Sequence, residues 1–220
     1  MYSHQDLQGN AIELPVGKIV CVGQNYHDHI AEMGSVVNEE AVLFMKPNTA
    51  FCNMLSDIHI PTDQGECHNE VEVAVLIKEK LSKVDETQAL SAIWGYGLGL
   101  DLTLREVQKK LKQLGRPWER AKAFDSSAPI SPFIEQAQIE DATNINFSLS
   151  VNDSIRQQGN TKLMIRDIAS LVSLISQHFT LLPGDVVLTG TPAGVAPLYA
   201  GDKLSLTIEQ HSFSTQVAHD

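Results

Sequence analysis

A chain of 220 residues with a hydrophobic fraction of 43% and a charged fraction of 20% is long enough for one sizeable core and has the composition of an ordinary soluble protein. Its formal net charge of −11 argues against a nucleic-acid partner, which requires a basic face. No apolar run reaches the length of a membrane span, and the polar N-terminus predicts no secretory signal. The three cysteines, Cys21, Cys52 and Cys67, form no disulfide framework, so we expect the reducing cytoplasm.

The predicted elements are mostly short β-strands separated by turns that contain glycine. In chain order, apolar runs predict buried strands at residues 18–22, 41–45 and 71–77. Residues 145–151 alternate apolar and polar side chains, which indicates a half-exposed strand. Two further strands follow Gly-Asp turns near the C-terminus, so the architecture should be mainly β.

Two helices interrupt this pattern. One is predicted at about 104–114, because Thr103 and Glu106 match a capping box and Gly115 suits the position after the helix. Its expected buried face consists of Leu104, Val107, Leu111 and Leu114. The other is predicted at about 166–178 from apolar residues at helical spacing. The basic residues between 105 and 122 are then expected to form a solvated helix face.

Two acidic side chains stand at the start of the predicted strand 71–77. Glu70 and Glu72 are two residues apart, so on a strand their carboxylates point to the same side. Two carboxylates beside an apolar strand repel each other and require a cation or a proton. Asp101 ends the apolar run 94–100 and is a third candidate ligand, and all-oxygen ligands favour Mg²⁺ or Mn²⁺. The alternative is that Glu70 and Glu72 lie on the solvent face of an edge strand.

A histidine and a glutamate form a second candidate pair. A spacing of three places His29 and Glu32 on one face of a helical turn. A histidine oriented by a carboxylate can act as a general base near neutral pH. The alternative is an ordinary surface pair.

Two further features carry possible chemistry. Lys122 lies in a stretch less polar than a lysine prefers. The alternative is a surface lysine whose side chain extends to solvent. Residues 189–194 form a glycine-rich turn with two threonines, whose backbone N–H groups can bind a carboxylate. A plain tight loop is the alternative.

Taken together, and in this order, these motifs resemble the fumarylacetoacetate hydrolase family. The segments that carry the resemblance are NYHDHIAEMG at 25–34, VEVAVLI at 71–77, GYGLGLDLTLREVQ at 95–108, PWERAKAFDSSAPIS at 117–131 and LLPGDVVLTGTPAGV at 181–195. The resemblance is closest to short, single-domain bacterial and mitochondrial members that act as acylpyruvate hydrolases or oxaloacetate decarboxylases. One position departs from those members, because His68-Asn69 stands where they commonly have His-His.

The resemblance implies an α+β, mainly β fold, a mixed β-sandwich roll of the C-terminal-domain type of that family with a few short helices. It implies an N-terminal extension at 1–15, a single catalytic domain at 16–220 and a homodimer.

The resemblance also assigns roles to the acidic residues and the histidine. It implies that Glu70, Glu72 and Asp101 bind Mg²⁺ or Mn²⁺. It places His29 and Glu32 on a short lid helix as the pair that activates water. We expect the segment from about residue 27 to 37 to be mobile without substrate and to become ordered when a 2-oxo acid binds.

The remaining site residues are implied in the same way. Lys122 would stabilise the developing charge of an enolate. The expected substrate contacts are Arg105, Gln108 and Thr191.

The implied reaction is Mg²⁺-dependent cleavage of the C3–C4 bond of a small 2,4-dioxo acid, such as acetylpyruvate or fumarylpyruvate, through a metal-stabilised enolate. Decarboxylation of oxaloacetate and enol–keto tautomerisation are alternatives, because both use the same enolate chemistry. Two non-catalytic alternatives remain. One is a β protein that contains a structural cation, and the other is a protein that binds 2-oxo acids without turnover.

Overall fold

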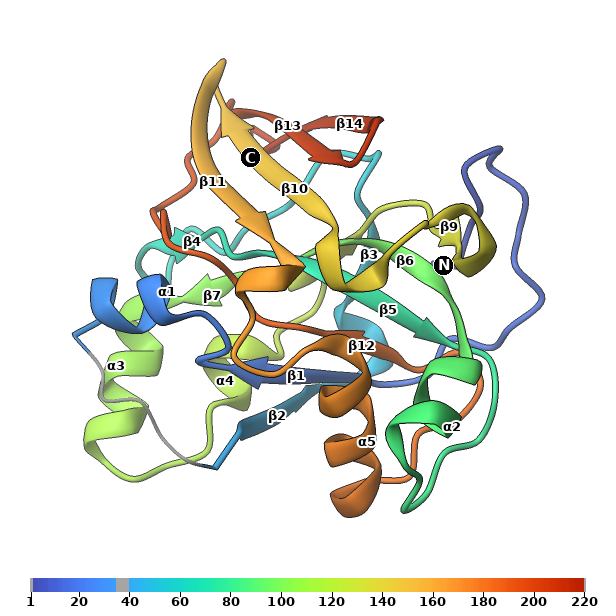
Figure 1. Cartoon of the computed structure of the whole chain (residues 1–220). Coiled ribbons are helices and arrows are strands. Elements are labelled where there is room, and N and C mark those ends of the chain that lie inside the picture. Colours follow the sequence, from blue (N-terminus) through green and yellow to red (C-terminus); the bar gives the residue numbers. More distant parts are fainter. Residues whose placement is uncertain (1, 35–39, 220) are drawn as a thin grey trace.

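The computed structural model describes residues 2–34 and 40–219, and its fold is α+β and mainly β, as predicted (Figure 1). The larger sheet has eight strands among the described residues. One of them, β9 (Ile134–Glu135), pairs only with β6 and lies outside the main strand order. The strand order is β2 (Val42–Lys46), β1 (Ile19–Gly23), β12 (Val186–Leu188), β5 (Val71–Ile77), β6 (Ile93–Leu100), β8 (Ala128–Ile130) and β3 (Phe51–Asn53).

A second, four-stranded sheet covers one face of the larger sheet (Figure 1). Its order is β11 (Ser154–Asn160), β10 (Asn146–Val151), β13 (Lys203–Ile208) and β14 (His211–Gln216). A short antiparallel pair joins β4 (Cys67–His68) to β7 (Thr103–Leu104). The burial of β10 alternates along the strand, as the sequence predicted for its half-exposed position.

Strand β5 lies at the centre of the molecule and is buried on both faces. Its odd-numbered residues, Val71 to Ile77, pack in the core between the two sheets with Phe147 and Leu206. Its even-numbered residues Ala74 and Leu76 belong to a second core on the other face of the larger sheet. A strand covered on both sides reads as a continuous apolar run, which is the pattern that predicted it.

The helices lie at the edges of the sheets. They are α1 (His27–Glu32), α2 (Glu86–Ser91), α3 (Arg105–Gln113), α4 (Glu119–Lys122) and α5 (Ile168–His178). Helices α2 and α5 pack against each other, whereas α1, α3 and α4 gather near the end of the sheet where β5 begins and β6 ends (Figure 1). None of the helices among the described residues is long and apolar enough to cross a lipid bilayer.

The start of α3 differs from the prediction. Leu104 caps the helix without a side-chain hydrogen bond, so the predicted capping box is wrong. Thr103 is instead part of β7, and its hydroxyl donates to the carbonyl oxygen of Asp101 at 3.0 Å. Gly115 has φ +61° just after the helix, as predicted, but Leu114 is 52% exposed rather than buried.

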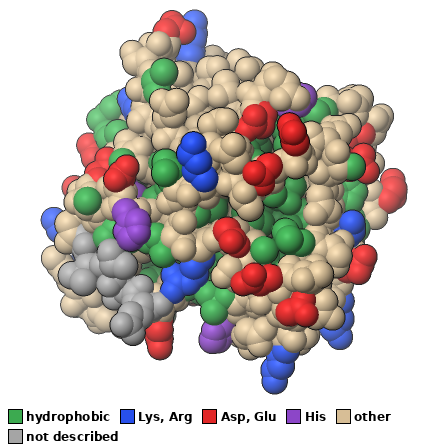
Figure 2. Space-filling view, in the orientation of Figure 1, with side chains coloured by type: hydrophobic (Ala, Val, Ile, Leu, Met, Phe, Trp, Pro, Cys, Tyr) green, Lys and Arg blue, Asp and Glu red, His purple; other side chains and the backbone are tan. Residues whose placement is uncertain are grey.

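The segments flanking the core follow the expected surface pattern. The predicted N-terminal extension packs against the larger sheet, where the buried His4 side chain contacts the carbonyl oxygen of Gly184 at 3.0 Å. Of the predicted lid segment, residues 27–32 form α1, and residues 35–37 lie outside the described part of the chain. Acidic side chains are spread over the face shown in Figure 2, and basic side chains do not gather there into one patch.

Candidate active site

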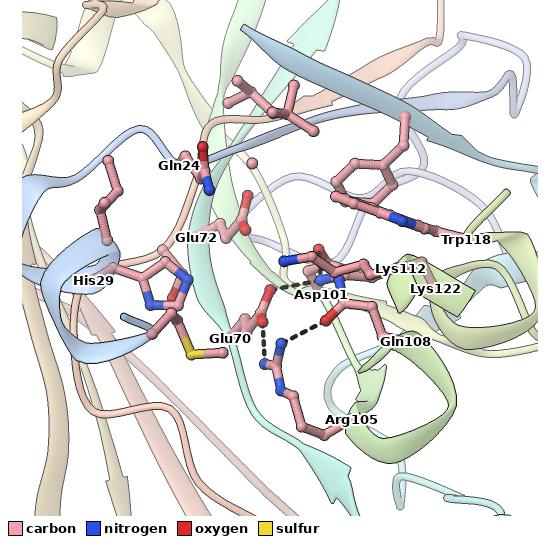
Figure 3. Close-up of a pocket in the computed structure, with 17 residues that line it drawn as sticks. Gln24, His29, Glu70, Glu72, Asp101, Arg105, Gln108, Lys112, Trp118 and Lys122 are labelled. Carbon is pink, nitrogen blue, oxygen red and sulfur yellow. Dashed lines mark hydrogen bonds and ion pairs between the residues drawn. The ribbon is translucent and has the colours of Figure 1, made fainter. Parts of the chain in front are cut away.

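Three carboxylates converge where β5 begins and β6 ends. Glu70 precedes β5, Glu72 lies within it, and Asp101 follows β6, whose antiparallel pairing places the Asp101 N–H against the Glu70 carbonyl oxygen at 2.8 Å. One carboxylate oxygen from each residue lies within 4.8 Å of the others. The three residues are 4%, 2% and 1% exposed, so the alternative of a solvent-facing strand is wrong (Figure 3).

Two cations compensate part of this negative charge. Lys122 places its Nζ 2.6 Å from Glu70 Oε2 and 2.6 Å from Asp101 Oδ2, and Arg105 forms an ion pair with Glu70. Burial raises the pKa of Glu70, but Lys122 and Arg105 outweigh it and hold that pKa well below its usual range. Lys122 is only 3% exposed, so its side chain does not extend to solvent.

Glu72 is the uncompensated member of the triad. No lysine or arginine of the described residues forms an ion pair with it, and its Oε2 accepts the Gly190 N–H at 2.7 Å. Burial raises the pKa of Glu72 well above its usual range, and the charges of Asp101 and Glu70 raise it further. A hard divalent cation fits this arrangement, because it prefers oxygen ligands and supplies the positive charge that Glu72 lacks.

A buried lysine that the sequence did not reveal holds the third carboxylate. Lys46, at the end of β2, is fully buried, and its Nζ lies 2.8 Å from Asp101 Oδ1. The same ammonium donates to the Lys122 carbonyl oxygen and, at 3.1 Å each, to the carbonyl and hydroxyl oxygens of Ser127. Lys46 therefore fixes Asp101 and the backbone that carries Lys122. The only sequence signal was a lysine directly after the apolar run 41–45.

Replacing Lys46 by methionine should destabilise the protein and weaken divalent-ion binding together. Methionine resembles the apolar part of the lysine side chain but leaves Asp101 without this partner, and breaking a buried ion pair typically costs about 3–5 kcal/mol. Denaturant unfolding and calorimetric titration with Mn²⁺ measure the two effects. Lys203→Met, at an exposed position, is the matched control and should change stability by no more than about 0.5 kcal/mol. Unchanged stability and ion affinity in Lys46→Met would contradict this role.

The predicted pair of His29 and Glu32 lies on α1, and His29 lines the same pocket (Figure 3). His29 Nδ1 lies 3.3 Å from Glu32 Oε2, and the other carboxylate oxygen of Glu32 accepts the Gly194 N–H at 2.9 Å. An ionised carboxylate can only accept, so this contact places a proton on Nδ1 and leaves the lone pair of a neutral ring on Nε2. His29 is 9% exposed, whereas Glu32 is exposed, so only the histidine of this pair is buried.

The glycine-rich turn after β12 binds carboxylates of the protein itself. Gly190 donates to Glu72, and Gly194 donates to Glu32. A Cβ at Gly194, where φ is +102°, would overlap the carbonyl oxygen of Arg156, so only glycine fits this turn. The predicted carboxylate-binding turn therefore orients two acids of the predicted site, Glu72 and Glu32.

A buried glutamine ties this turn to β5. Gln157, from β11, is 1% exposed and donates to the Thr191 hydroxyl at 2.8 Å. Its carbonyl oxygen accepts the Val71 N–H at 2.9 Å and the Asn69 side-chain N–H at 2.8 Å. Asn69, the position that departs from the related members, is thus part of a hydrogen-bonded network. The sequence carried no signal for Gln157, because it contacts residues far away along the chain.

The predicted substrate contacts line the same pocket as the triad. Arg105 and Gln108 extend from α3, and an Arg105 N–H donates to Gln108 Oε1 at 2.8 Å (Figure 3). Thr191 also lines the pocket, but its hydroxyl donates to the Val71 carbonyl oxygen at 2.9 Å and already accepts from Gln157. The structure thus brings all the predicted site residues to one pocket, with Glu32 behind His29.

Known proteins are similar to this chain in sequence and in fold. The family description "Fumarylacetoacetate (FAA) hydrolase C-terminal" matches residues 18–218. The chain is 53% identical to the oxaloacetate tautomerase YcgM of Escherichia coli over 218 residues, which covers 99% of this chain and 100% of that protein. It is 42% identical to the mitochondrial oxaloacetate tautomerase of Homo sapiens over 190 residues, or 86% of each chain.

Solved structures agree with these sequence relationships. The crystal structure of fumarylpyruvate hydrolase from Pseudomonas aeruginosa, in complex with Mn²⁺ and pyruvate, superposes with a TM-score of 0.93 at 34% identity. The match covers 100% of this chain and 96% of the other. With a family match over most of its length and a buried acidic triad, the chain belongs to the fumarylacetoacetate hydrolase family.

Proposed function

We propose that this protein catalyses enol–keto tautomerisation of oxaloacetate, using Mg²⁺ or Mn²⁺ bound by Glu70, Glu72 and Asp101. The observation that carries the proposal is one pocket lined by a buried carboxylate triad, a buried lysine and a histidine whose Nδ1 contacts Glu32 (Figure 3). Relatives at 53% and 42% identity are named oxaloacetate tautomerases, which supports this choice.

The reaction moves one proton between the enol oxygen and C3. When bound, the cation supplies a Lewis acid that offsets negative charge on the 2-oxo oxygen. Arg105 and Gln108 bind the substrate carboxylate that is next to the 2-oxo group, since a guanidinium and an amide N–H are donors for it. Lys122 places a second positive charge beside the triad. His29 is held by Glu32. Its Nε2 accepts the proton from the enol oxygen and donates it to C3.

Hydrolysis of an acylpyruvate is a second candidate for the same pocket. The specific observation that favours it is the hydrogen-bonded pair of His29 and Glu32, which has the arrangement needed to deprotonate a water molecule for attack at C4. The similar Pseudomonas aeruginosa structure is a fumarylpyruvate hydrolase, which also supports this candidate. Decarboxylation of oxaloacetate needs no water and would use the same cation and lysine.

A product assay with Mg²⁺ separates these activities. Loss of enol absorbance from oxaloacetate without pyruvate identifies the tautomerase, whereas pyruvate with CO₂ identifies the decarboxylase. Pyruvate with an organic acid from acetylpyruvate or fumarylpyruvate identifies the hydrolase. Each activity should disappear with a chelator. If the protein binds oxalate, an unreactive enolate mimic, but turns over none of these substrates, catalysis would be contradicted. The protein would then be one that binds 2-oxo acids without turnover.

We also propose that the protein is a homodimer, as the family resemblance implies. Light scattering at micromolar concentration is expected to give a mass of about 48 kDa, twice the chain mass of 24.1 kDa. A mass equal to that of one chain would contradict the dimer.

A further inference from the structure

Helix α3 presents a third polar side chain to the pocket beyond the two already assigned. Arg105, Gln108 and Lys112 all line it, and their spacing of three and four residues places them on one helix face. A rise of about 1.5 Å per residue sets Lys112 about 10 Å from Arg105 along the helix axis. Arg105 forms an ion pair with Glu70 of the triad. Lys112 therefore lies at the end of this helix face that is farther from the triad.

The position of Lys112 is defined by an aromatic wall. Its Nζ lies 5.8 Å from the ring centroid of Trp118, and Trp118 packs against Phe44 with ring centroids 5.8 Å apart. On the inner side, Lys122 Nζ lies 5.2 Å from the Phe44 ring. The two aromatic rings thus stand between an inner lysine and an outer lysine, and Figure 3 shows Lys112 beside Trp118 at the pocket.

Within the described part of the chain, Lys112 has no acidic partner, in contrast to the other cations of the site. Lys46, Lys122 and Arg105 all form ion pairs with the triad. No acidic side chain of the described residues forms an ion pair with Lys112, although the chain as a whole carries a formal charge of −11. An unpaired ammonium at a pocket that takes an anionic substrate is placed to attract a second negative group.

We propose that Lys112 binds the distal carboxylate of the substrate and makes the site selective for 2-oxo acids that carry two carboxylates. This inference rests on the proposed function, because it assumes that the 2-oxo acid end lies at the triad with Arg105 and Gln108. The flexible lysine side chain reaches distal carboxylates at different chain lengths, which accommodates both short and longer diacids. The side chain is exposed, so its contribution to affinity decreases as salt increases.

Two unreactive acids test the inference. 2-Oxoglutarate and 2-oxopentanoate have the same five-carbon chain and the same 2-oxo acid end, and only the former has a distal carboxylate. Their dissociation constants are measured with Mg²⁺ by calorimetry for the wild type, Lys112→Met and Lys112→Arg. Lys110→Met, on the opposite face of α3, is the matched control.

Lys112→Met is expected to weaken 2-oxoglutarate binding about tenfold and to leave 2-oxopentanoate binding unchanged, since one charged hydrogen bond is lost. Lys112→Arg retains the positive charge and should restore most of the preference, and Lys110→Met should behave like the wild type. Equal changes for both acids in Lys112→Met, or no change for either, would overturn the role of Lys112 alone. A wild type that binds neither acid would overturn this inference, whereas the proposed function is overturned only if the product assay with oxaloacetate and the acylpyruvates shows no turnover.

Discussion

Replacing Glu72 by glutamine is expected to lower both divalent-ion affinity and kcat/KM by at least about 10²-fold. Loss of a residue that only supports a metal ligand already costs about 10–100-fold, so loss of a ligand should cost no less. Glutamine has nearly the same shape, and its carbonyl oxygen can still accept the Gly190 N–H. The substitution therefore removes the ligand charge while preserving the local hydrogen bond.

The stability of the metal-free protein provides an independent measurement. Glu72 is 2% exposed and has no cationic partner among the described side chains, so a neutral replacement removes an unfavourable buried charge. The metal-free Glu72→Gln variant should melt at the same temperature as the wild type or higher, but Mn²⁺ should no longer raise its melting temperature. Glu135→Gln, at an exposed position, is the control for both measurements. Full ion affinity in Glu72→Gln would show that the metal site is wrongly placed.

His29→Ala should separate the activities of the pocket. Hydrolysis of acetylpyruvate requires a base for the attacking water, and losing general-base assistance costs about 10²–10⁴-fold. Decarboxylation of oxaloacetate requires the cation and the positive charge of Lys122 but no water, so its kcat should fall much less. Lys122→Ala should instead reduce both reactions, because both develop the same negative charge.

The contacts of Glu32 suggest a competing role for this histidine. Glu32 joins His29 to Gly194, so the pair can also fasten α1 against the glycine-rich turn. In that case hydrolysis and decarboxylation would decrease together in His29→Ala, and the assignment as a water-activating base would be wrong. His27→Ala, an exposed histidine on the same helix, is the matched control. The kcat values for both substrates are measured with one preparation of each variant.

Local periodicity was enough to predict the parts of the site that lie close together in sequence. The two-residue period of a strand fixes Glu70 and Glu72 on one side, and the helical spacing of three fixes His29 against Glu32. The apolar pattern also predicted β5 and the buried face of α5. These features depend on backbone geometry over a few residues, which the sequence specifies by itself.

The tertiary structure decided which side chains from distant segments meet. Lys46 reaches Asp101, and Gln157 reaches Val71 across 86 residues of chain, so no local pattern announces either contact. Thr103 matched a capping box, yet the pairing of β7 with β4 took its place. The basic residues between 105 and 122 read as a solvated face, but docking of α3 and α4 at the end of β6 buries Lys122 against the carboxylates. Burial and charge pairing depend on long-range packing, and only the assembled sheets create them.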